Sequence, residues 1–435
     1  MRQPNIVFII TDQQRHDTIA ALGNDHMITP NLDKLVEDGT SFTKMYATSP
    51  CCSPSRASLF SGLYPHNTGV LRNDDKWVYT WVPLLAKAGY RCVNVGKMHT
   101  SPFEEPLGFH ERHVVENKDR AHPGLPYYLD NWDKALWAGG YVKPTRETYC
   151  QRADYNERLG AFVWELPEEM HPDIFVAQSA VHWLETYKGD EPFFLEIGIP
   201  GPHPPYDPTA KALAHYDGKK LPEPIREYDL DTQPIALRKL RENHIENDHD
   251  AVVHLENPTP EQTQRQRAHY FANITMIDEQ LGALRQALED RGVADNTIII
   301  FTSDHGDSLN DHGHSQKWNM FEPSVRVPAV VYDPRASKKG VQVDDLTALF
   351  DFGPTILELA GVEPPEWMEA SSLAPFLNGG AKPRRGPVFA ELADDMVQEY
   401  CQFMTMIREG DWKLVYFLNS DEGKKLIQQQ FDEAI

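Results

Sequence analysis

The segment with the clearest potential for chemistry is a pair of cysteines at the start of a short helical pattern. Residues 51–62 read CCSPSRASLFSG and follow a turn-forming stretch at 48–50, so we expect Cys52 in the first turn of a helix that Gly62 ends. Unpaired backbone N–H groups and the helix dipole favour an anion at such a terminus. Arg56, one turn further on, faces the same side. The pattern predicts an anion-binding site with a thiol at its mouth; the alternative is a buried or metal-binding thiol.

Polar residues also gather at the ends of the predicted strands. They follow four apolar runs in chain order: Asp12 and Gln13, then Lys97 and His99, then His203, then Asp304 and His305. Each has an ordinary structural explanation, such as a helix cap, a hydrogen-bonded loop histidine or a solvated lysine. In an open α/β sheet, however, ligands bind outside the carboxyl ends of the strands. The recurrence of polar residues there favours one shared site.

Four of these residues form a candidate site for one divalent metal ion. Asp12, Asp304 and His305 supply two carboxylates and an imidazole, and Gln13 supplies a neutral amide oxygen. Oxygen ligands suit Ca²⁺ or Mg²⁺, whereas the imidazole also admits Mn²⁺ or Zn²⁺. The residue types alone leave these four cations open.

The elements that must position these residues alternate between strands and helices. Short, continuous apolar runs predict buried strands at 6–10, 91–95, 193–199, 297–302 and 327–331. Helical patterns predict helices at 31–37, 83–88, 175–187, 260–291 and 346–359. The helix at 260–291 has the clearest start, with an N-cap Thr259, a proline at the first position and a capping-box Gln262. This order predicts an α/β fold with helices on both faces of a large, mostly parallel sheet.

Two insertions and a C-terminal segment depart from this alternation. We expect residues 102–170 and 206–258, rich in Pro, Trp, Tyr, His and acidic residues, to form walls of a substrate pocket; surface cover or an oligomer contact is the alternative. Short antiparallel strands are predicted at 388–392, 403–407 and 412–417, with a polar helix near 424–434. We therefore divide the chain into a catalytic domain at 1–364 and a small α+β subdomain at 365–435.

Composition argues against several classes of function. The 435 residues carry a formal net charge of −23, which disfavours nucleic acid and anionic membranes as partners and requires a local positive site for any anionic substrate. Five cysteines, two of them adjacent, do not suggest a disulfide framework in a chain of this length. We find neither a signal peptide nor a stretch apolar enough to span a bilayer, so the sequence predicts a cytoplasmic location and no membrane partner.

The spacing Cys-x-Pro-x-Arg from Cys52 to Arg56, with Leu59 and residues 61–62 behind it, resembles the signature of the type I sulfatases of the alkaline-phosphatase-like superfamily. Further blocks resemble that family in the same order, at 5–13, 29–33, 96–99, 202–205, 297–306, 317 and 321–322. The likeness covers about residues 4 to 362, and the insertions between blocks are unmatched. It implies a sulfuric ester hydrolase in which a sulfatase-maturing enzyme oxidises Cys52 to formylglycine (3-oxoalanine).

The resemblance also implies the metal ligands. Asp12, Gln13, Asp304, His305 and the modified Cys52 would hold the ion, for which Ca²⁺ is the family expectation. Many sulfatases carry a second Asp at the position of Gln13 and an Asn at that of His305. The site in this chain is therefore less negative than the usual one.

Catalytic roles are implied for five further positions. Arg56 would orient the modified cysteine, and Lys97 would bind sulfate oxygens. His99 would take a proton as the aldehyde re-forms. His203 and Lys317 would hold the substrate and assist the leaving oxygen. In the mechanism that the resemblance implies, one hydroxyl of hydrated formylglycine attacks sulfur and the other expels sulfate.

These observations favour a sulfatase that releases an alcohol or phenol and inorganic sulfate. A phosphonate monoester hydrolase or phosphodiesterase of the same superfamily is the alternative, because residues 12–13 and 304–305 resemble the metal site of that group. Residues 96–99 instead follow the sulfatase pattern. A non-catalytic relative that binds sulfated ligands is disfavoured, because none of the chemical residues is missing.

Three further expectations concern ligands and assembly. Asn73 is a candidate sulfate contact, although an ordinary exposed loop asparagine would look the same. The expected substrate is a small-molecule or saccharide sulfate ester, whose identity the two insertions would determine. A homo-oligomer is the expected form of the protein.

Overall fold

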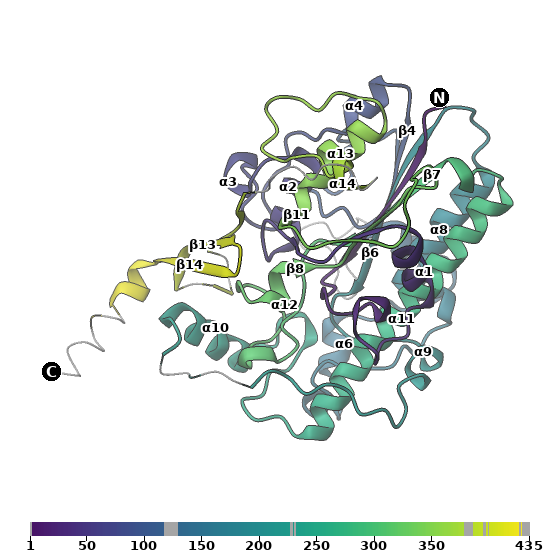
Figure 1. The fold of residues 1–435 in the computed structure, drawn as a ribbon. Helices are drawn as coiled ribbons and strands as arrows, with labels where there is room; N and C mark the ends of the chain where they lie inside the picture. The colour runs from purple at the N-terminus through teal and green to yellow at the C-terminus, as the bar shows by residue number, and fades with distance from the viewer. Residues whose placement is uncertain are drawn as a thin grey trace.

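The structure is a computed structural model that describes residues 2–116, 129–226, 229, 232–377, 386–394, 397–398, 400–425 and 428. Within the described chain, the centre is an eight-stranded sheet with helices on both sides (Figure 1). In sheet order, its strands are β10 (Val341–Val343), β2 (Thr40–Phe42), β9 (Ala329–Tyr332), β7 (Thr297–Ser303), β1 (Asn5–Asp12), β6 (Phe193–Pro202), β4 (Arg91–Gly96) and β5 (Glu111–Val114).

Parallel pairing dominates the middle of this sheet. β1 pairs in parallel with β6 on one side and with β7 on the other, and β6 pairs in parallel with β4. β9 runs antiparallel to β7 and β2. The predicted large, mostly parallel sheet is confirmed, and each of the five predicted strands contributes to it.

Strand β1 explains why its sequence is a continuous apolar run. All eight of its residues are buried. Ile6, Phe8 and Ile10 enter the core on one face of the sheet. Val7 and Ile9 enter the core on the opposite face. Because successive side chains of a strand point to opposite faces, a strand covered on both sides needs apolar residues at every position.

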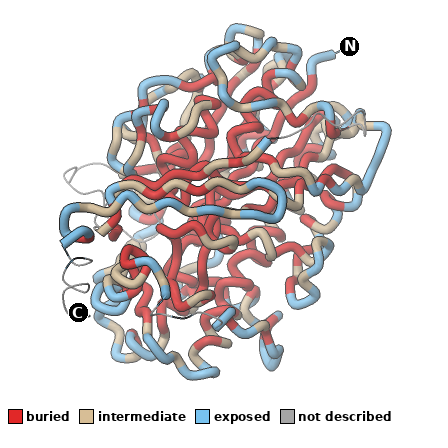
Figure 2. The backbone as a smooth tube through the Cα atoms, turned by 60° about the vertical axis from the view of Figure 1, so that its left-hand side comes forward, coloured by how far each residue is buried: buried red, intermediate tan, exposed pale blue. Residues whose placement is uncertain are grey.

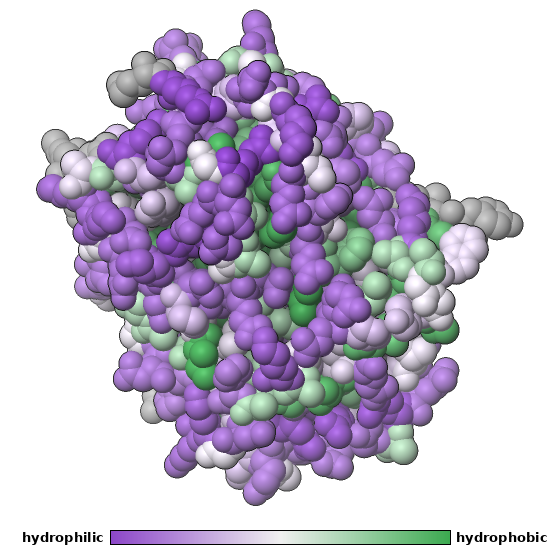
Figure 3. Space-filling model, turned by 90° about the vertical axis from the view of Figure 1, so that its right-hand side faces the viewer, coloured by the Kyte–Doolittle hydropathy of each residue, from purple (hydrophilic) through white to green (hydrophobic). Residues whose placement is uncertain are grey.

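Helices close both cores. One core is covered by α1 (Pro30–Asp38), α8 (Pro172–Thr186) and α11 (Pro260–Asp290). The other is covered by α2 (Cys52–Ser61), α4 (Val82–Lys87), α13 (Phe352–Leu359) and α14 (Ala374–Leu377). The predicted capping box of α11 is present, because Thr259 and Gln262 each accept a hydrogen bond from the backbone N–H of the other. The surface on the α8 and α11 side is mainly hydrophilic (Figure 3).

Shorter elements connect these layers. The helices are α3 (Pro65–Thr68), α5 (Asn131–Ala138), α6 (Arg146–Cys150), α7 (Tyr155–Arg158), α9 (Ala210–Ala214), α10 (Ile235–Glu246) and α12 (Glu322–Val325). The 3-10 turns are η1 (Ala20–Leu22), η2 (Glu168–Met170), η3 (His249–Ala251), η4 (Ala294–Asn296) and η5 (Asp311–Gly313). No helix in the described part of the chain combines the length and apolarity that crossing a membrane requires.

The predicted helix at 346–359 is wrong at its start. β11 (Thr347–Ala348) is a strand that pairs in parallel with β3 (Met45–Tyr46), and β8 (Arg326–Val327) completes this small sheet. A 3-10 turn, η6 (Leu349–Asp351), then leads into α13. A short apolar run fits a buried strand as well as a buried helix, and here the pairing with β3 decides between them.

The C-terminal segment forms the predicted antiparallel sheet of β12 (Val388–Ala393), β13 (Cys401–Glu409) and β14 (Trp412–Asn419). Its inner face packs around Cys51 and Trp318, and the hairpin of β13 and β14 lies on the outside of the molecule (Figure 2). The predicted helix at 424–434 lies mostly outside the described residues. Among the described residues of this region, 421–425 are helical. The division at residues 364 and 365 stays a prediction.

A glycine pair allows β4 and β6 to approach where β4 ends. The backbone N–H of Lys97 donates to the carbonyl oxygen of Gly198 at 2.8 Å. A Cβ atom on Gly198 would lie 1.8 Å from the carbonyl oxygen of Lys97. Gly96 has a φ of +98°, and a Cβ atom on it would lie 2.1 Å from the carbonyl oxygen of Gly198. The backbone can therefore follow this path at Lys97 only because residue 198 is a glycine, which has no side chain.

Gly198→Ala should lower the free energy of unfolding by about 1–3 kcal/mol or more, because the added methyl group forces the two strands apart. The matched control is Gly386→Ala, since a Cβ atom there would meet nothing within 4 Å. That variant should stay within about 0.5 kcal/mol of the wild type. Urea unfolding compares the two, and equal stability of both variants would contradict this account of the strand contact.

Candidate active site

Helix α2 begins as predicted, with Cys52 as its first residue. Cys51 is the N-cap and has the extended φ of −150° typical of that position. The side-chain oxygen of Asn73 accepts hydrogen bonds from the backbone N–H of Ser53 at 3.1 Å and from the Cys51 thiol at 3.3 Å. Asn73 therefore caps the helix, and its predicted contact with sulfate remains a prediction.

The structure brings together four of the five predicted metal ligands. One potential ligand atom from each of Asp12, Cys52, Asp304 and His305 lies within 4.8 Å of the others, and all four residues are buried. The Cys52 Sγ lies 3.1 Å from His305 Nε2 and 3.6 Å from Asp12 Oδ1. The parallel register of β1 and β7 pairs Thr11 with Ser303, so the residues that follow these strands meet.

This donor set fits a divalent cation. Two buried carboxylates supply hard oxygen ligands, and an imidazole and residue 52 complete a compact group. Gln13 lies beside the group and is fixed by two hydrogen bonds. Its Nε2 donates to Asp307 at 2.8 Å, and its Oε1 accepts from Lys317 Nζ at 3.0 Å. Gln13 stays a predicted ligand whose amide oxygen faces Lys317.

Arg56 connects the cysteine helix to two strand ends. Its Nε donates to Asp304 Oδ2 at 2.7 Å, and its Nη1 donates to the carbonyl oxygen of Lys97 at 2.6 Å. Both partners of the Arg56–Asp304 ion pair are fully buried. Arg56 thus orients Asp304 and anchors the segment that carries Lys97.

Two lysines supply positive charge at the centre of the site. Lys97 Nζ forms an ion pair with Asp12, and Lys317 Nζ donates to Cys52 Sγ at 3.0 Å. Burial raises the pKa of Asp12, but Lys97, His203 and Lys317 outweigh it and hold that pKa well below its usual value. Burial and Asp12 raise the pKa of the Cys52 thiol, yet Lys317, His305 and Lys97 produce a net lowering. The site therefore favours negative charge on both groups.

The two remaining catalytic candidates are neutral histidines. Burial and the charge of Lys97 hold the pKa of His99 well below its usual value. Burial and the charge of Lys317 do the same for His203. The backbone N–H of His99 donates to Glu116 at 3.0 Å, and Nδ1 of His203 lies 2.8 Å from the carbonyl oxygen of Pro204. Both imidazoles are therefore neutral at neutral pH, which is the form that a general base requires.

The two insertions meet beside His203. Arg146 in α6 forms an ion pair with Asp250 in η3, and Asp250 Oδ2 lies 3.8 Å from His203 Nε2. A second contact joins the insertions where the Tyr149 hydroxyl donates to Asp207 at 2.9 Å. Both insertions therefore reach the surroundings of one predicted catalytic residue.

Several supporting residues were missed by the sequence analysis. The Ser55 hydroxyl donates to the carbonyl oxygen of Asp304 at 2.6 Å, and Asp307 accepts from the Tyr206 hydroxyl at 2.7 Å. Ser55 lies inside the cysteine motif at 51–62, and Asp307 directly follows the block at 297–306, so their positions offered a signal. Glu116 lies in an irregular segment and Asp250 in η3, and neither position follows a recognisable sequence pattern.

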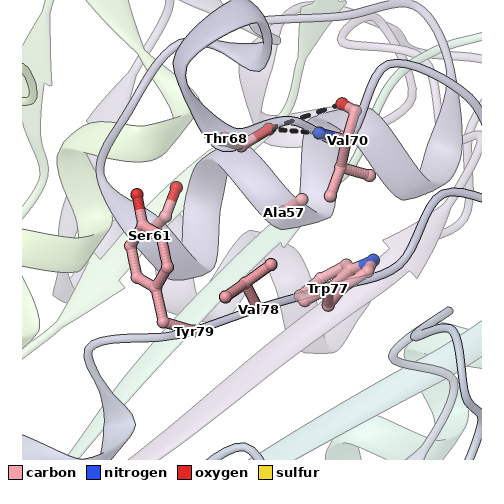
Figure 4. A pocket seen from close by; sticks show the side chains of 7 residues that line it. All are labelled: Ala57, Ser61, Thr68, Val70, Trp77, Val78 and Tyr79. Carbon is pink, nitrogen blue, oxygen red and sulfur yellow. Dashed lines mark hydrogen bonds between the residues drawn. The ribbon is translucent and has the colours of Figure 1, made fainter.

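A small pocket lies beside α2, and Figure 4 shows the side chains that line it. It is lined by Ala57, Ser61, Thr68, Val70, Trp77, Val78 and Tyr79. None of these is a predicted site residue. Trp77 connects this pocket to the cysteine helix, because its Nε1 donates to the Ser53 hydroxyl at 2.9 Å.

A buried carboxyl group lies beneath the site on β6. Glu196 is fully buried, and Asn94 donates a hydrogen bond to it. Burial raises the pKa of Glu196 to about 8 from an ordinary value of 4.5, although Arg56 opposes this. The folded chain thus keeps this proton between about pH 4.5 and about pH 8, whereas the unfolded chain releases it. The free energy of unfolding falls as pH rises through this window.

Glu196→Gln should reduce this pH dependence, because the amide is neutral in both states. As pH rises from about 5 to about 8, the free energy of unfolding should fall less for the variant than for the wild type. The difference between the two should be on the order of a few kcal/mol. Urea unfolding at both pH values measures the difference. The exposed Glu422→Gln is the control and should follow the wild type. A Glu196→Gln variant with the wild-type pH dependence would refute the buried neutral carboxyl.

Comparison with known proteins identifies the family of the chain. The Sulfatase family model matches residues 4–362, and the model for the C-terminal part of N-sulphoglucosamine sulphohydrolase matches residues 310–434. The chain is 32% identical to an arylsulfatase of Clostridium perfringens, over 85% of this chain and 78% of that protein. It is 31% identical to a choline-sulfatase of Rhizobium meliloti, over 95% of this chain and 78% of that protein.

The structure of phosphonate monoester hydrolase from Agrobacterium radiobacter is also similar. It superposes with a TM-score of 0.77 and 25% identity, over 96% of this chain and 88% of that one. Two findings assign the chain to a family. The Sulfatase model matches most of the chain, and two sulfatases are more than 30% identical to it. The chain belongs to the sulfatase family of the alkaline-phosphatase-like superfamily and is a sulfuric ester hydrolase.

Proposed function

We propose that the chain hydrolyses a sulfate ester at residue 52, after a sulfatase-maturing enzyme has converted Cys52 to formylglycine. The surroundings of the Cys52 side chain carry this proposal. Lys317 Nζ lies 3.0 Å, His305 Nε2 3.1 Å and Asp12 Oδ1 3.6 Å from its sulfur atom. A nucleophile at this position lies between cations that can neutralise an anionic ester and carboxylates that can hold a metal ion.

In this proposal, the buried group of acidic and imidazole side chains holds one divalent cation. Asp12, Asp304, His305 and residue 52 are its ligands, with Gln13 as a neutral oxygen donor, and Ca²⁺ is the first candidate. A bound cation supplies positive charge that polarises the ester oxygens. Hydrated formylglycine at residue 52 would supply a geminal diol. One hydroxyl would attack sulfur and displace the alcohol or phenol, and loss of the proton of the other would then expel sulfate and re-form the aldehyde.

The remaining side chains bind charge and move protons. Lys97 and Lys317 bind sulfate oxygens, with Asn73 as a further candidate contact. Neutral His99 accepts the proton that is released as sulfate leaves. His203 contacts the leaving oxygen, and its position next to both insertions supports their proposed role as walls of the substrate pocket.

Phosphonate monoester hydrolysis is the second candidate, because the structural similarity to phosphonate monoester hydrolase extends over nearly the whole chain. Both substrates present a tetrahedral anion to the same lysines. The sulfatase relatives and the lysine and histidine at positions 97 and 99 favour the sulfate ester. Within that class, we propose a small-molecule or saccharide ester, since relatives include an arylsulfatase, a choline-sulfatase and an N-acetylglucosamine-6-O-sulfatase.

A serine in place of Cys52 tests the proposed nucleophile. Serine has a single hydroxyl, so a Cys52→Ser variant should release at most one equivalent of alcohol or phenol and retain one SO₃ group on the helix α2 peptide. Cys52→Ala should do neither and lose activity by more than about 10³-fold. Cys51→Ser is the control and should turn over repeatedly.

Burst kinetics with an aryl sulfate and peptide mass spectrometry measure both outcomes. Repeated turnover by Cys52→Ser would contradict the proposed two-hydroxyl mechanism. The same assays on the mature wild type with an aryl phosphonate monoester separate the two candidate functions. A larger kcat/KM for the phosphonate would favour the second candidate.

Removal of divalent cations tests the proposed metal site independently of turnover. Chelation should lower the midpoint of thermal unfolding, and Ca²⁺ should restore it, because the cation binds only the folded ligand group. Asp12→Asn should lose this Ca²⁺-dependent shift, whereas Asp421→Asn, at an exposed position, should keep it. A wild-type midpoint that does not respond to chelation or to Ca²⁺ would refute the cation at this site.

A further inference from the structure

The C-terminal sheet carries an unusually apolar outer face. On β14, Trp412, Leu414, Tyr416 and Leu418 are 85%, 66%, 64% and 40% exposed. The alternate residues Val415 and Phe417 pack against the inner core instead. A strand with one face in water normally alternates apolar and polar residues, whereas apolar residues at both faces are typical of a strand covered on both sides. The sequence of β14 is thus typical of a strand with both faces covered, and the described residues of one chain cover only its inner face.

Strand β13 extends this face. In the antiparallel register, Ile407 lies opposite Leu414, and Phe403 lies opposite Leu418. Both are half-buried. We define the outer patch as Phe403, Ile407, Trp412, Leu414, Tyr416 and Leu418. The hairpin of β13 and β14 that carries it lies on the outside of the molecule, as the backbone view in Figure 2 shows.

We propose that the outer patch docks on the same patch of a second copy of this chain. The two sheets would pack face to face, with their β14 strands antiparallel and Val415 of each chain nearest the two-fold axis. Trp412 would then lie over Leu418 of the other chain, and Leu414 over Tyr416. Such an isologous contact places apolar side chains against apolar side chains at each position of β14.

The exposed area supports a second copy as the occupant. The four β14 side chains together expose about 500 Å², from the usual size of aromatic and aliphatic side chains. A stable interface buries about 800 Å² on each partner, so the patch supplies more than half of that area and its polar rim supplies the rest. Other large exposed apolar residues lie in other parts of the chain: Trp137 in α5, and Val142 and Ile225 outside helices and strands.

Charges at the two ends of the hairpin disfavour a parallel arrangement. The turn between β13 and β14 carries the exposed acidic residues Glu409 and Asp411. The segment after β14 carries two exposed acidic residues and two exposed lysines, and Lys424 Nζ pairs with Asp421 at 3.2 Å, so this segment is locally neutral. Antiparallel packing places the acidic turn of one chain near this neutral segment of the other, whereas parallel packing would bring two acidic turns together. The difference matters because the net charge of −23 already repels a second copy.

The molar mass of the full chain in solution tests this proposal. The wild type should sediment as a species of twice 49.6 kDa that dissociates on dilution. Leu414→Lys should weaken the dimer by about 100-fold or more, because it places a charge in the apolar contact. The matched control Val142→Lys introduces the same charge at an 80% exposed valine outside the patch and should remain a dimer. Far-UV circular dichroism checks that each variant is folded.

A mixture of two variants tests the arrangement. Leu414→Lys and Tyr416→Glu should each be monomeric alone, and mixing them should restore a two-chain species, because the new lysine lies over the new glutamate. A wild type that stays monomeric at high concentration would overturn the proposal and show that something other than a second copy covers the patch. A dimer that survives Leu414→Lys would place the interface elsewhere. Failure of the mixture to associate would refute the antiparallel arrangement.

Discussion

The burial of opposite charges at the carboxyl edge of the central sheet is the constraint on which the site depends. Asp12 and Asp304 are fully buried, and an unpaired carboxylate in such a place is strongly destabilising. Arg56 pairs with Asp304 and Lys97 with Asp12, so each anion has a buried cation. Four separate elements must therefore meet within one small volume, because β1, α2, β4 and β7 each supply or lead into one of these charges.

The backbone makes this meeting possible in two ways. The parallel register of β1 with β7 brings Asp12 and Asp304 to the same level of the sheet. The close contact of Gly96 and Gly198 lets the chain turn out of the sheet at Lys97. Cys52 reaches this edge as the first residue of α2, where Asn73 accepts a hydrogen bond from the backbone N–H of Ser53 in the first turn of the helix. Its side chain thereby lies between the carboxylates and Lys317, which is the arrangement that a charged substrate requires.

Much of the fold and of the central site could be predicted from sequence, because burial and strand order leave local patterns in the sequence. Strand β1 reads as a continuous apolar run since it is covered on both faces, and polar residues that follow parallel strands must meet at one edge. The start of α2 at Cys52 follows from the turn and the spacing of that segment.

Other features depend on distant contacts that leave no local signal. The strand at Thr347–Ala348 exists because Met45–Tyr46 lies beside it, and the contact of Asp250 with His203 needs two insertions to pack together. Glu116 lies in an irregular segment, yet it holds the backbone of His99.

The measurement that tests the central claim most directly is the mass of the peptide containing Cys52, from protein made with and without a sulfatase-maturing enzyme. The account predicts an aldehyde that traps hydrazine, found only with that enzyme and together with turnover. A Cys52 that stays a thiol while the protein still turns over sulfate esters would contradict it.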